Sequence, residues 1–206
     1  GRSQSVESEV DIQRTKQANI PVIRRPTGGG TVIHHRENLN YSIYLPEPKT
    51  GDIHEEQRRW AEPLISSLRS IGLPAEYREN GLYLGGKKIS GIAESRRWGL
   101  LHHGTLLLGM PPEFRDIKRW LKAPRDDYRK PSSGVASRPS PVTSLETESS
   151  KEIALSKLLR NWIAELSKAL DGDAREGKVT PRETKFARHL RQHKYSDLNW
   201  NQSLRE

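Results

Sequence analysis

The sequence Arg24-Arg25-Pro26-Thr27-Gly28-Gly29-Gly30-Thr31-Val32-Ile33-His34 carries the strongest signal in this chain. Three consecutive glycines let the backbone approach a ligand and aim several N–H groups at an anion. The two arginines before them add forked donors that suit phosphate or carboxylate. No Lys-Ser or Lys-Thr closes a P-loop here, and no helix follows as in a dinucleotide fingerprint. The segment predicts a ligand-contacting turn, with a plain hairpin turn as the alternative.

A second basic segment reads Gly86-Lys87-Lys88-Ile89-Ser90-Gly91-Ile92-Ala93. A lysine in a hairpin strand can lay its stem on apolar surface and reach a pocket with its ammonium group. There it could hold a phosphate or carboxylate, or stabilise charge in a transition state. The alternative is a double lysine at a solvated strand end.

Two histidines, His102 and His103, stand inside an apolar run at 100–108. Paired histidines can bind metal, but no Asp, Glu or Cys stands nearby at ligand spacing. We therefore expect a hydrogen-bonded structural pair and predict no metal site made by protein side chains.

The remaining chain predicts strands before helices, joined by hairpins, which favours an α+β fold. A Gly85-Gly86 turn joins strands 82–84 and 87–89 in a predicted hairpin, and Pro124 to Thr147 is an expected long loop. Capping residues predict helix starts at Asp52, Ser149 and Thr180. The other expected elements are a helix at 7–18, strands at 31–35, 39–45 and 98–108, and helices at 52–71, 149–172 and from 181 onward.

The predicted helix at 149–172 has an apolar face of Leu155, Leu159, Trp162, Leu166 and Leu170. Trp60 lies in the predicted helix at 52–71, and its spacing likewise suits core packing. Both tryptophans are therefore expected to be buried.

Composition limits the function classes. The chain has 206 residues, which fits one domain, and 33% of them are hydrophobic. No stretch is long and apolar enough for a membrane helix, and the absence of Cys makes a cytoplasmic setting the default expectation. The start at Gly1 without a Met suggests a truncated amino terminus. A net charge of +9 favours an acidic partner such as a nucleotide, a nucleic acid or an acidic protein.

Together these segments resemble the lipoate–protein ligase family of the biotin/lipoate ligase superfamily. Residues 24–34 are similar to its pattern of two Arg, two variable residues, three Gly, a strand and a His. Lys88-Ile89-Ser90-Gly91-Ile92-Ala93 resembles its Lys-Ile-Ser-Gly-Ser-Ala element, and residues 102–107 match its His-His-Gly-Thr-Leu-Leu. Segments at 1–4, 137–145 and 194–201 resemble further family motifs, so the likeness runs nearly end to end.

The resemblance implies one catalytic domain over residues 1–206, with a mixed, largely antiparallel sheet flanked by helices. It implies ATP, Mg²⁺ and lipoate as cofactors, with lipoate held as lipoyl-AMP. It also implies that Lys88 is catalytic, contacting the acyl carboxyl and the adenylate phosphate. The implied nucleotide contacts are Arg25, Gly30, Thr31, Val32, Ile33 and Lys88. The implied substrate contacts are Arg24, Gly28, Gly29, Ser90, Gly91, His103 and Gly104.

The implied reaction is transfer of a lipoyl group to a lysine of an acidic lipoyl carrier domain, with neither nucleic acid nor membrane as partner. The glycine turn and Lys88 are expected to converge on the activated acyl group. In the family an accessory domain can be fused, separate or absent, so a separate one is a further expected partner. One departure matters: members commonly carry Asn-Asp before the lysine hairpin, whereas here Gly81 follows Asn80.

Three rival functions stay open. Octanoyl transfer through a cysteine thioester is disfavoured because the sequence has no Cys. A catalytically idle, carrier-binding relative is compatible with the missing Asp. A basic nucleic-acid-binding module would place aromatic residues among the lysines and arginines of one strand face, whereas Trp60 and Trp162 lie in predicted helices.

Overall fold

The computed structural model describes residues 1–46, 51–79, 81–97 and 99–203. The chain divides into two compact units, each built from segments far apart in the sequence. Unit 1 comprises Gly1–Ile33, Asp116–Pro139 and Glu176–Glu206. Unit 2 comprises His34–Arg115 and Ser140–Arg175.

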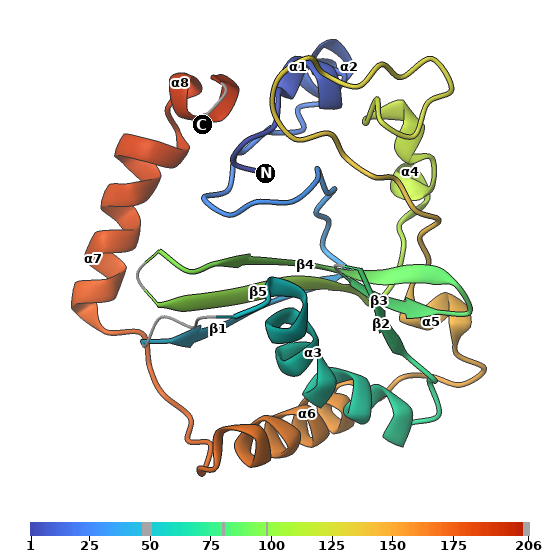
Figure 1. Cartoon of the computed structure of the whole chain (residues 1–206), viewed down its shortest axis with the longest axis vertical. Coiled ribbons are helices and arrows are strands. Elements are labelled where there is room, and N and C mark those ends of the chain that lie inside the picture. Colours follow the sequence, from blue (N-terminus) through green and yellow to red (C-terminus); the bar gives the residue numbers. More distant parts are fainter. Residues whose placement is uncertain (47–50, 80, 98, 204–206) are drawn as a thin grey trace. The chain divides into compact units, whose positions relative to one another are not determined.

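Unit 2 is built on a five-stranded sheet of order β1-β5-β4-β3-β2, in which every neighbouring pair is antiparallel (Figure 1). The strands are β1 (Asn38–Leu45), β2 (Glu76–Arg78), β3 (Gly81–Leu84), β4 (Lys87–Ser95) and β5 (Leu100–Leu107). A parallel pairing occurs at an isolated bridge between Lys88 and Val142. The predicted α+β class and largely antiparallel sheet are confirmed.

The predicted hairpin between β3 and β4 is confirmed. Gly85 and Gly86 both have positive φ, 53° and 79°, which a two-residue turn of this kind requires. The pairing register shifts next to this turn, because Leu82 pairs with Ser90 whereas Tyr83 pairs with Lys88. Ile89 is the extra residue of this bulge, and it is fully buried in the core.

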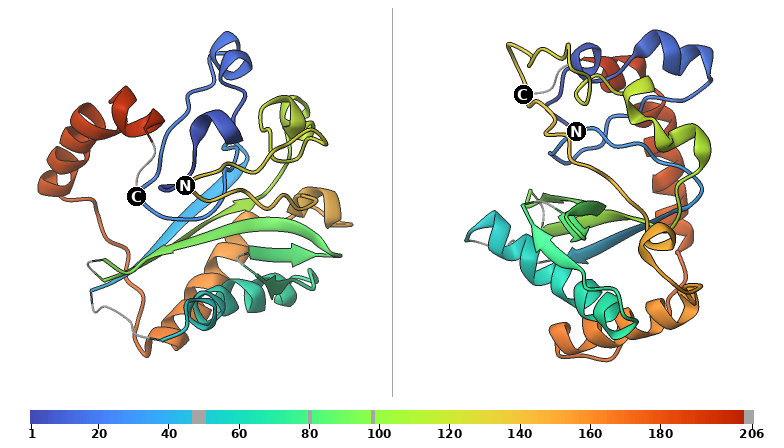
Figure 2. Two further views of the ribbon diagram at one scale, coloured as in Figure 1. Left: turned by 45° about the horizontal axis from the view of Figure 1, so that its top comes forward. Right: turned by 90° about the vertical axis from the view of Figure 1, so that its right-hand side faces the viewer.

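Two helices, α3 (Ile53–Ser70) and α6 (Leu155–Leu170), cover one face of this sheet (Figures 1 and 2). Asp52 caps α3 by accepting hydrogen bonds from the backbone N–H groups of His54 and Glu55, as predicted, and Gly72 with φ 88° ends it. Trp60 and Trp162 are buried, which confirms their expected core role. Two short helices, α4 (Pro112–Arg115) and α5 (Leu145–Glu148), complete the unit.

The predicted start of α6 is wrong. Ser149 does not cap a helix: its hydroxyl donates to the carbonyl of Lys151, and its N–H closes α5 on Leu145. Its backbone is therefore extended, and α6 begins only after Ala154. Leu170, predicted on the apolar face, is 48% exposed at the end of the helix.

Three other predicted elements also differ. The expected helix at 7–18 is two helices, α1 (Val6–Glu9) and α2 (Ile12–Gln17), because Val10 between them bridges to Leu121. Residues 31–35 form no strand, since the N–H of Thr31 donates to a side chain rather than to a neighbouring strand. The strand predicted at 98–108 is β5, which begins at Leu100 and includes both histidines; residue 98 lies outside the described residues.

Unit 1 holds α1 and α2 together with three short helical segments and one longer helix, α7. These are η1 (Ile117–Arg119), α7 (Pro181–Leu190), η2 (Arg191–Tyr195) and α8 (Leu198–Gln202). The capping box predicted at Thr180 and Glu183 is confirmed, with both reciprocal hydrogen bonds present. Among the described residues of the whole chain, no helix has the length and apolarity needed to span a bilayer.

Candidate functional site

In unit 1, Arg24 is a buried hub of hydrogen bonds. Its side chain is almost fully buried, with 3% of the residue exposed, and its guanidinium donates five hydrogen bonds to backbone carbonyls. The acceptors are the carbonyl oxygens of Gly1, Arg2, Gln4, Trp200 and Gln202. The N–H of Arg24 donates to Asn201, and the indole of Trp200 donates back to the carbonyl of Arg24. Arg24 thus ties the amino-terminal segment to the carboxy-terminal one; its predicted substrate contact stays a prediction.

Arg25 braces the glycine turn by hydrogen bonds to its carbonyls. Its guanidinium donates to the carbonyl of Gly28 at 2.5 Å and to that of Gly30 at 2.9 Å. Gly29 has φ 87°, a conformation that favours glycine. Burial lowers the pKa of Arg25, although the group stays charged at neutral pH. The carbonyls of the glycine turn are therefore cross-linked by a cation.

Ser137 closes the turn on its other side, a role that the sequence did not indicate. Its hydroxyl oxygen accepts hydrogen bonds from the N–H of Thr31 at 2.9 Å and from the side chain of Gln4 at 3.0 Å. A Cβ on Gly30 would lie 3.0 Å from that hydroxyl, so the third glycine gives Ser137 its place. Only the family-like Ser137-Arg138 motif could have pointed to this contact.

A buried carboxylate supports the same loop. Glu9 is 1% exposed, and its Oε1 accepts from the hydroxyl of Tyr128 at 2.6 Å and from the N–H of Ser137 at 3.2 Å. Burial, with the Glu9 carboxylate beside it, raises the pKa of Tyr128 to about 12. Glu9 was not predicted as a functional residue, because its partners lie more than 100 positions away.

In unit 2, Lys88 lies on the sheet face opposite α3 and α6, here called the Lys88 face. Its backbone is fixed by two bonds, from its N–H to the carbonyl of Pro141 and from the N–H of Thr143 to its carbonyl. Its side chain is half-buried, with the ammonium 5.8 Å from the ring centre of Tyr83. Burial lowers the pKa of Lys88, and the Glu79 carboxylate partly offsets this. A preorganised cation of this kind suits a carboxyl or phosphate oxygen.

Two glycines and other short side chains lie on the Lys88 face near this lysine. Gly81, Gly91, Thr105 and Asn40 form one cross-strand row, and Ala93 lies in the next row beside His103. A Cβ on Gly81 would overlap Cε of Lys88 and come within 3.0 Å of its Nζ. The lysine therefore lies in the space that a side chain at position 81 would take. Residue 80, the other half of the Asn80-Gly81 departure, lies outside the described residues.

Two other predicted substrate contacts face the helices. Ser90 is 1% exposed, on the face that packs against α3 and α6, here called the helix face. A Cβ on Gly104 would lie 2.5 Å from the hydroxyl of Tyr41, so this glycine makes room for a core tyrosine. The ring of Tyr41 packs edge-on against Trp162, and burial raises the pKa of Tyr41. Ser90 and Gly104 could reach a ligand on the Lys88 face only through their backbone.

The adjacent histidines have separate surroundings. His102 is fully buried on the helix face, with Nδ1 2.8 Å from Oε1 of Glu94, whose side chain is also fully buried. Arg96 lies 3.8 Å from the same carboxylate, and it donates to the carbonyls of Gly51 and Asp52 before α3. The predicted structural role of the histidines fits His102, but its partner is Glu94 rather than the other histidine.

His103 lies on the Lys88 face, half-buried and opposite Ala93 and Ser42. Thr105, two residues on, donates to Asn40 at 2.9 Å and lies 3.4 Å from Nε2 of His34. Lys88, Gly91 and His103 of the predicted site therefore share one face. The glycine turn belongs to unit 1, so its predicted convergence with Lys88 stays a prediction.

The described residues offer no cluster of metal ligands made by protein side chains alone. They hold no group of three or more His, Cys, Asp or Glu that could bind a metal ion, and position 81 carries no carboxylate. Mg²⁺ in proteins commonly binds through one or two carboxylates and substrate phosphates, so Mg²⁺ stays a prediction, and no chemical step below is derived through a metal.

Comparison with known proteins identifies the class. A family model described as "Lipoyl protein ligase A/B catalytic domain" matches residues 1–167, and the chain belongs to this family. Lipoate-protein ligase A subunit 1 of Thermoplasma acidophilum is 31% identical over 99% of the chain and 80% of that protein. Octanoyltransferase LipM of Symbiobacterium thermophilum is 27% identical over 98% and 81%. The chain is accordingly an enzyme, a ligase or transferase.

Solved structures agree with this assignment. A bi-partite lipoate protein ligase from Thermoplasma acidophilum, described with its E2 lipoyl domain, superposes with a TM-score of 0.77 at 29% identity. The superposition covers 100% of this chain and 80% of the archaeal one. A lipoate-protein ligase A bound with ATP has a TM-score of 0.78 at 28% identity, with 100% of this chain and 81% of that one covered.

Proposed function

We propose that this protein transfers a lipoyl group from lipoyl-AMP to a lysine on an acidic lipoyl carrier domain. The observation that carries the proposal is the placement of Lys88. The half-buried side chain of Lys88 lies over Gly81, in the space that a larger residue at position 81 would fill. The backbone of Lys88 is fixed by hydrogen bonds with Pro141 and Thr143. A carrier domain as partner is supported by the archaeal ligase described with its E2 lipoyl domain.

The chemistry needs positioning and charge more than a protein nucleophile. The amine of the carrier lysine attacks the carbonyl carbon of the mixed anhydride, forming a C–N bond. The C–O bond to the phosphate then breaks, AMP leaves, and the amine loses a proton to solvent. In the tetrahedral intermediate the negative oxygen is stabilised by the Lys88 ammonium, which also neutralises the departing phosphate.

The glycine turn supplies the nucleotide contacts in this proposal. Arg25 and the backbone from Gly30 to Ile33 hold the adenylate, while Gly28 and Gly29 shape the path of the acyl chain. Nη1 of Arg25 makes no hydrogen bond to the described residues, so it can serve the phosphate. Gly91 and His103 line the Lys88 face beside the acyl group. Arg24 is assigned a supporting part, because its donors are engaged by carbonyls.

Octanoyl transfer is the second candidate, because LipM octanoyltransferases are among the relatives. A route through a protein-bound cysteine thioester is closed to this chain, since its 206 residues include no Cys. An octanoyl group carried as an adenylate would still fit the same geometry. Acyl chain length is therefore the point on which the two candidates differ. The catalytically idle relative makes a third outcome, in which neither acyl group is transferred.

The test is a set of parallel reactions with one carrier domain, read by intact mass. One contains ATP, Mg²⁺ and lipoate, the second preformed lipoyl-AMP, and the third octanoyl-AMP. The proposal expects modification in the second reaction. Modification also in the first would show that the chain activates lipoate unaided, and its appearance only after adding an accessory domain would assign activation to that pair. No modification from either adenylate would overturn the proposal. ATP and Mg²⁺ use and a cytoplasmic setting stay predictions until then.

A further inference from the structure

Helix α7 has ten residues and none of them is buried, whereas the other described helical segments without a buried residue are only three to five residues long. Phe186 in its middle is 61% exposed, and Val179 just before it is 76% exposed. Isolated helices of this length are marginal in water, and most helices in proteins are stabilised by packing an apolar stripe. A ten-residue helix that presents a phenylalanine to solvent therefore lacks the contact that would normally stabilise it.

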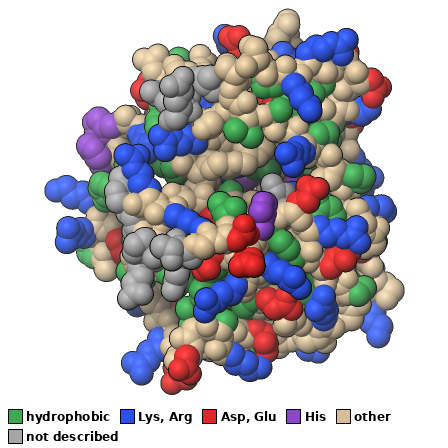
Figure 3. All heavy atoms as spheres, in the orientation of Figure 1, with side chains coloured by type: hydrophobic (Ala, Val, Ile, Leu, Met, Phe, Trp, Pro, Cys, Tyr) green, Lys and Arg blue, Asp and Glu red, His purple; other side chains and the backbone are tan. Residues whose placement is uncertain are grey.

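Positive charge is concentrated on the same segment. Residues 177–194 contain six Lys or Arg and one Glu, a net charge of +5 within a chain of net +9. The single acid, Glu183, is occupied in the capping box with Thr180. Figure 3 shows Lys, Arg and His side chains gathered at the left edge, where α7 runs in Figure 1.

The cations of α7 have no acidic partner in the described chain. The side chains of Arg182, Lys185 and Arg188, and of Arg191 directly after the helix, form no ion pair or hydrogen bond with the described residues. Lys87 of unit 2, by contrast, pairs with Glu148. Unpaired charge of one sign beside an exposed aromatic is the composition of an interface with an oppositely charged partner.

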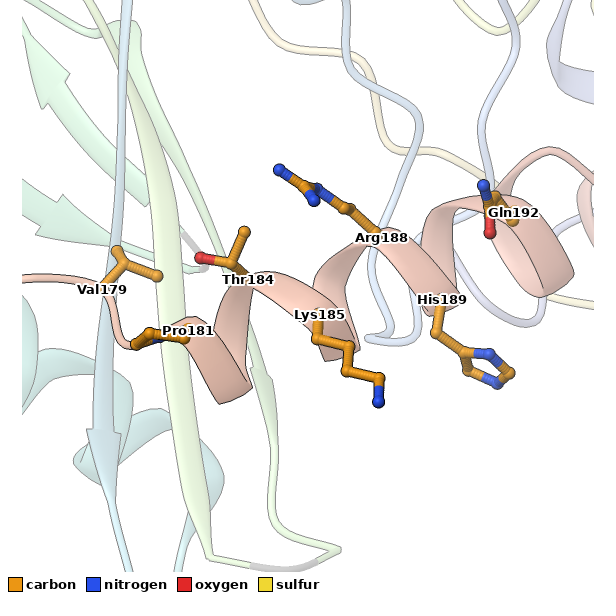
Figure 4. A pocket seen from close by; sticks show the side chains of 7 residues that line it. All are labelled: Val179, Pro181, Thr184, Lys185, Arg188, His189 and Gln192. Atoms are coloured by element: carbon orange, nitrogen blue, oxygen red, sulfur yellow. The ribbon is translucent and has the colours of Figure 1, made fainter.

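A pocket of about 590 Å³ lies against this helix, lined by Lys185, Arg188 and His189 among others. Figure 4 shows Arg188 pointing away from Lys185 and His189, so cations stand on both sides of the helix. The ring of His189 stacks on that of His193 at 4.3 Å, which fixes its orientation on the pocket rim. An acidic side chain approaching from the side of Lys185 would meet this cation, with the imidazole of His189 one helical turn further on.

We infer that α7 is the surface on which the acidic carrier domain docks. Phe186 supplies the apolar anchor and Lys185, beside it in the sequence, orients the carrier, while Arg188 on the other side of the helix adds to the positive field that steers the carrier. This inference rests on the proposed function for the identity of its partner. The surface itself stands on the exposure, the charge and the pocket of α7.

The decisive variant reverses two charges, Lys185→Glu with Arg188→Glu. The chain offers a matched control on α6, Lys157→Glu with Arg160→Glu, which are also three residues apart, exposed and free of ion pairs among the described residues. Both variants change the net charge equally, so a difference between them reports position rather than total charge. Phe186→Ser removes the anchor without changing charge. Circular dichroism before and after heating checks that each variant folds.

Binding of an unmodified carrier domain is measured by calorimetry, without chemistry. The α7 charge variant is expected to bind about tenfold more weakly, and the α6 control within about twofold of wild type. The gap should shrink at about 0.5 M salt, where the charges are screened. Phe186→Ser should also weaken binding. Equal binding by the α7 variant and the wild type overturns the inference. The inference is also overturned if the α7 variant binds a short RNA or DNA duplex more weakly than the wild type does but binds the carrier equally well.

The same variants separate this inference from the proposed function. With preformed lipoyl-AMP, the α7 charge variant should transfer to hydroxylamine, a small nucleophile, at the wild-type rate, while its KM for the carrier rises. If the wild type binds the carrier through α7 but never modifies it, the docking surface stands and the proposed function falls. If the α7 variant modifies the carrier with an unchanged KM, docking at α7 falls and the proposed function stands.

Discussion

The two faces of the unit 2 sheet differ in what their polar groups do, and His102 and His103 show this most clearly. His102 is fully buried with Glu94 on the helix face, whereas His103 is half-buried on the Lys88 face. One strand carries both, because successive side chains in a strand point to opposite faces. The His-His motif in the sequence therefore does not by itself show which histidine stabilises the fold and which one lies at the candidate site.

The largest effect is expected from the Lys88 face. Lys88→Ala should lower the rate of lipoyl transfer from lipoyl-AMP by about 10²–10³-fold, a loss typical of removing one oxyanion-stabilising donor. Thermal stability should be close to wild type, since the lysine is only half-buried. Single-turnover transfer to a carrier domain, followed by mass spectrometry, measures the rate. A variant with the full rate would contradict the assignment of Lys88.

Substitutions on the helix face should lower stability rather than the rate of transfer. His102→Ala should lower the free energy of unfolding by about 3 kcal/mol, because it leaves a cavity and deprives the buried Glu94 carboxylate of its partner. His103→Ala is the matched control and should change stability by less than about 1 kcal/mol. Urea unfolding of both variants gives the comparison. Equal losses for the two histidines would mean that the faces do not differ as described.

The next largest effect is expected at Gly81, whose missing side chain leaves the space that the Lys88 side chain occupies. Gly81→Ala should displace the Lys88 ammonium and lower transfer about tenfold, because the new Cβ overlaps Cε of the lysine. The same Cβ also crowds the carbonyl of Ser90, so a stability loss of about 1–3 kcal/mol is expected. In a Lys88→Ala background the change at Gly81 should no longer affect the residual rate. Multiplying effects in the double variant would argue against the contact.

The smallest effect concerns pH. Burial lowers the pKa of Lys88 below its ordinary 10.5, so the protonated, active form should be lost at a lower pH than an ordinary lysine would show. Transfer should accordingly decline as pH rises through that folded pKa. For stability the sign is opposite: the cost of burying the charge is present below the folded pKa and fades as pH rises toward 10.5. Lys88→Met should remove this pH dependence in parallel transfer and unfolding titrations.

Local sequence patterns predicted several elements correctly. The Gly85-Gly86 hairpin, the Asp52 cap and the Thr180 capping box each depend on residues only a few positions apart, and each is confirmed. The bounds of β1 and α3 also came close to 39–45 and 52–71. The predictions failed where a distant group took the backbone bonds. Thr31, for example, donates to Ser137 instead of a strand. The helix start expected at Ser149 failed for a local reason, because its N–H closes α5 on Leu145 and its backbone is extended.

The candidate site was predicted in part for the same reason. Lys88, Gly91 and His103 share a face because strand alternation and the β4–β5 register bring them together. Glu94 was missed as the partner of His102, since its position opposite that histidine depends on the register. Counting back along the two strands of a hairpin would have found it. Nothing local in the sequence marks Glu9 or the engagement of Arg24 by carbonyls.

The central claim is that the Lys88 face holds the activated acyl group, and binding of a non-hydrolysable lipoyl-adenylate analogue tests it most directly. Calorimetry should give a single site in the wild type and at least about tenfold weaker binding in Lys88→Ala, as expected for a lost hydrogen bond to a charged group. His103→Ala should weaken binding less. Equal affinity of the wild type and Lys88→Ala, or no binding to either, would contradict the account.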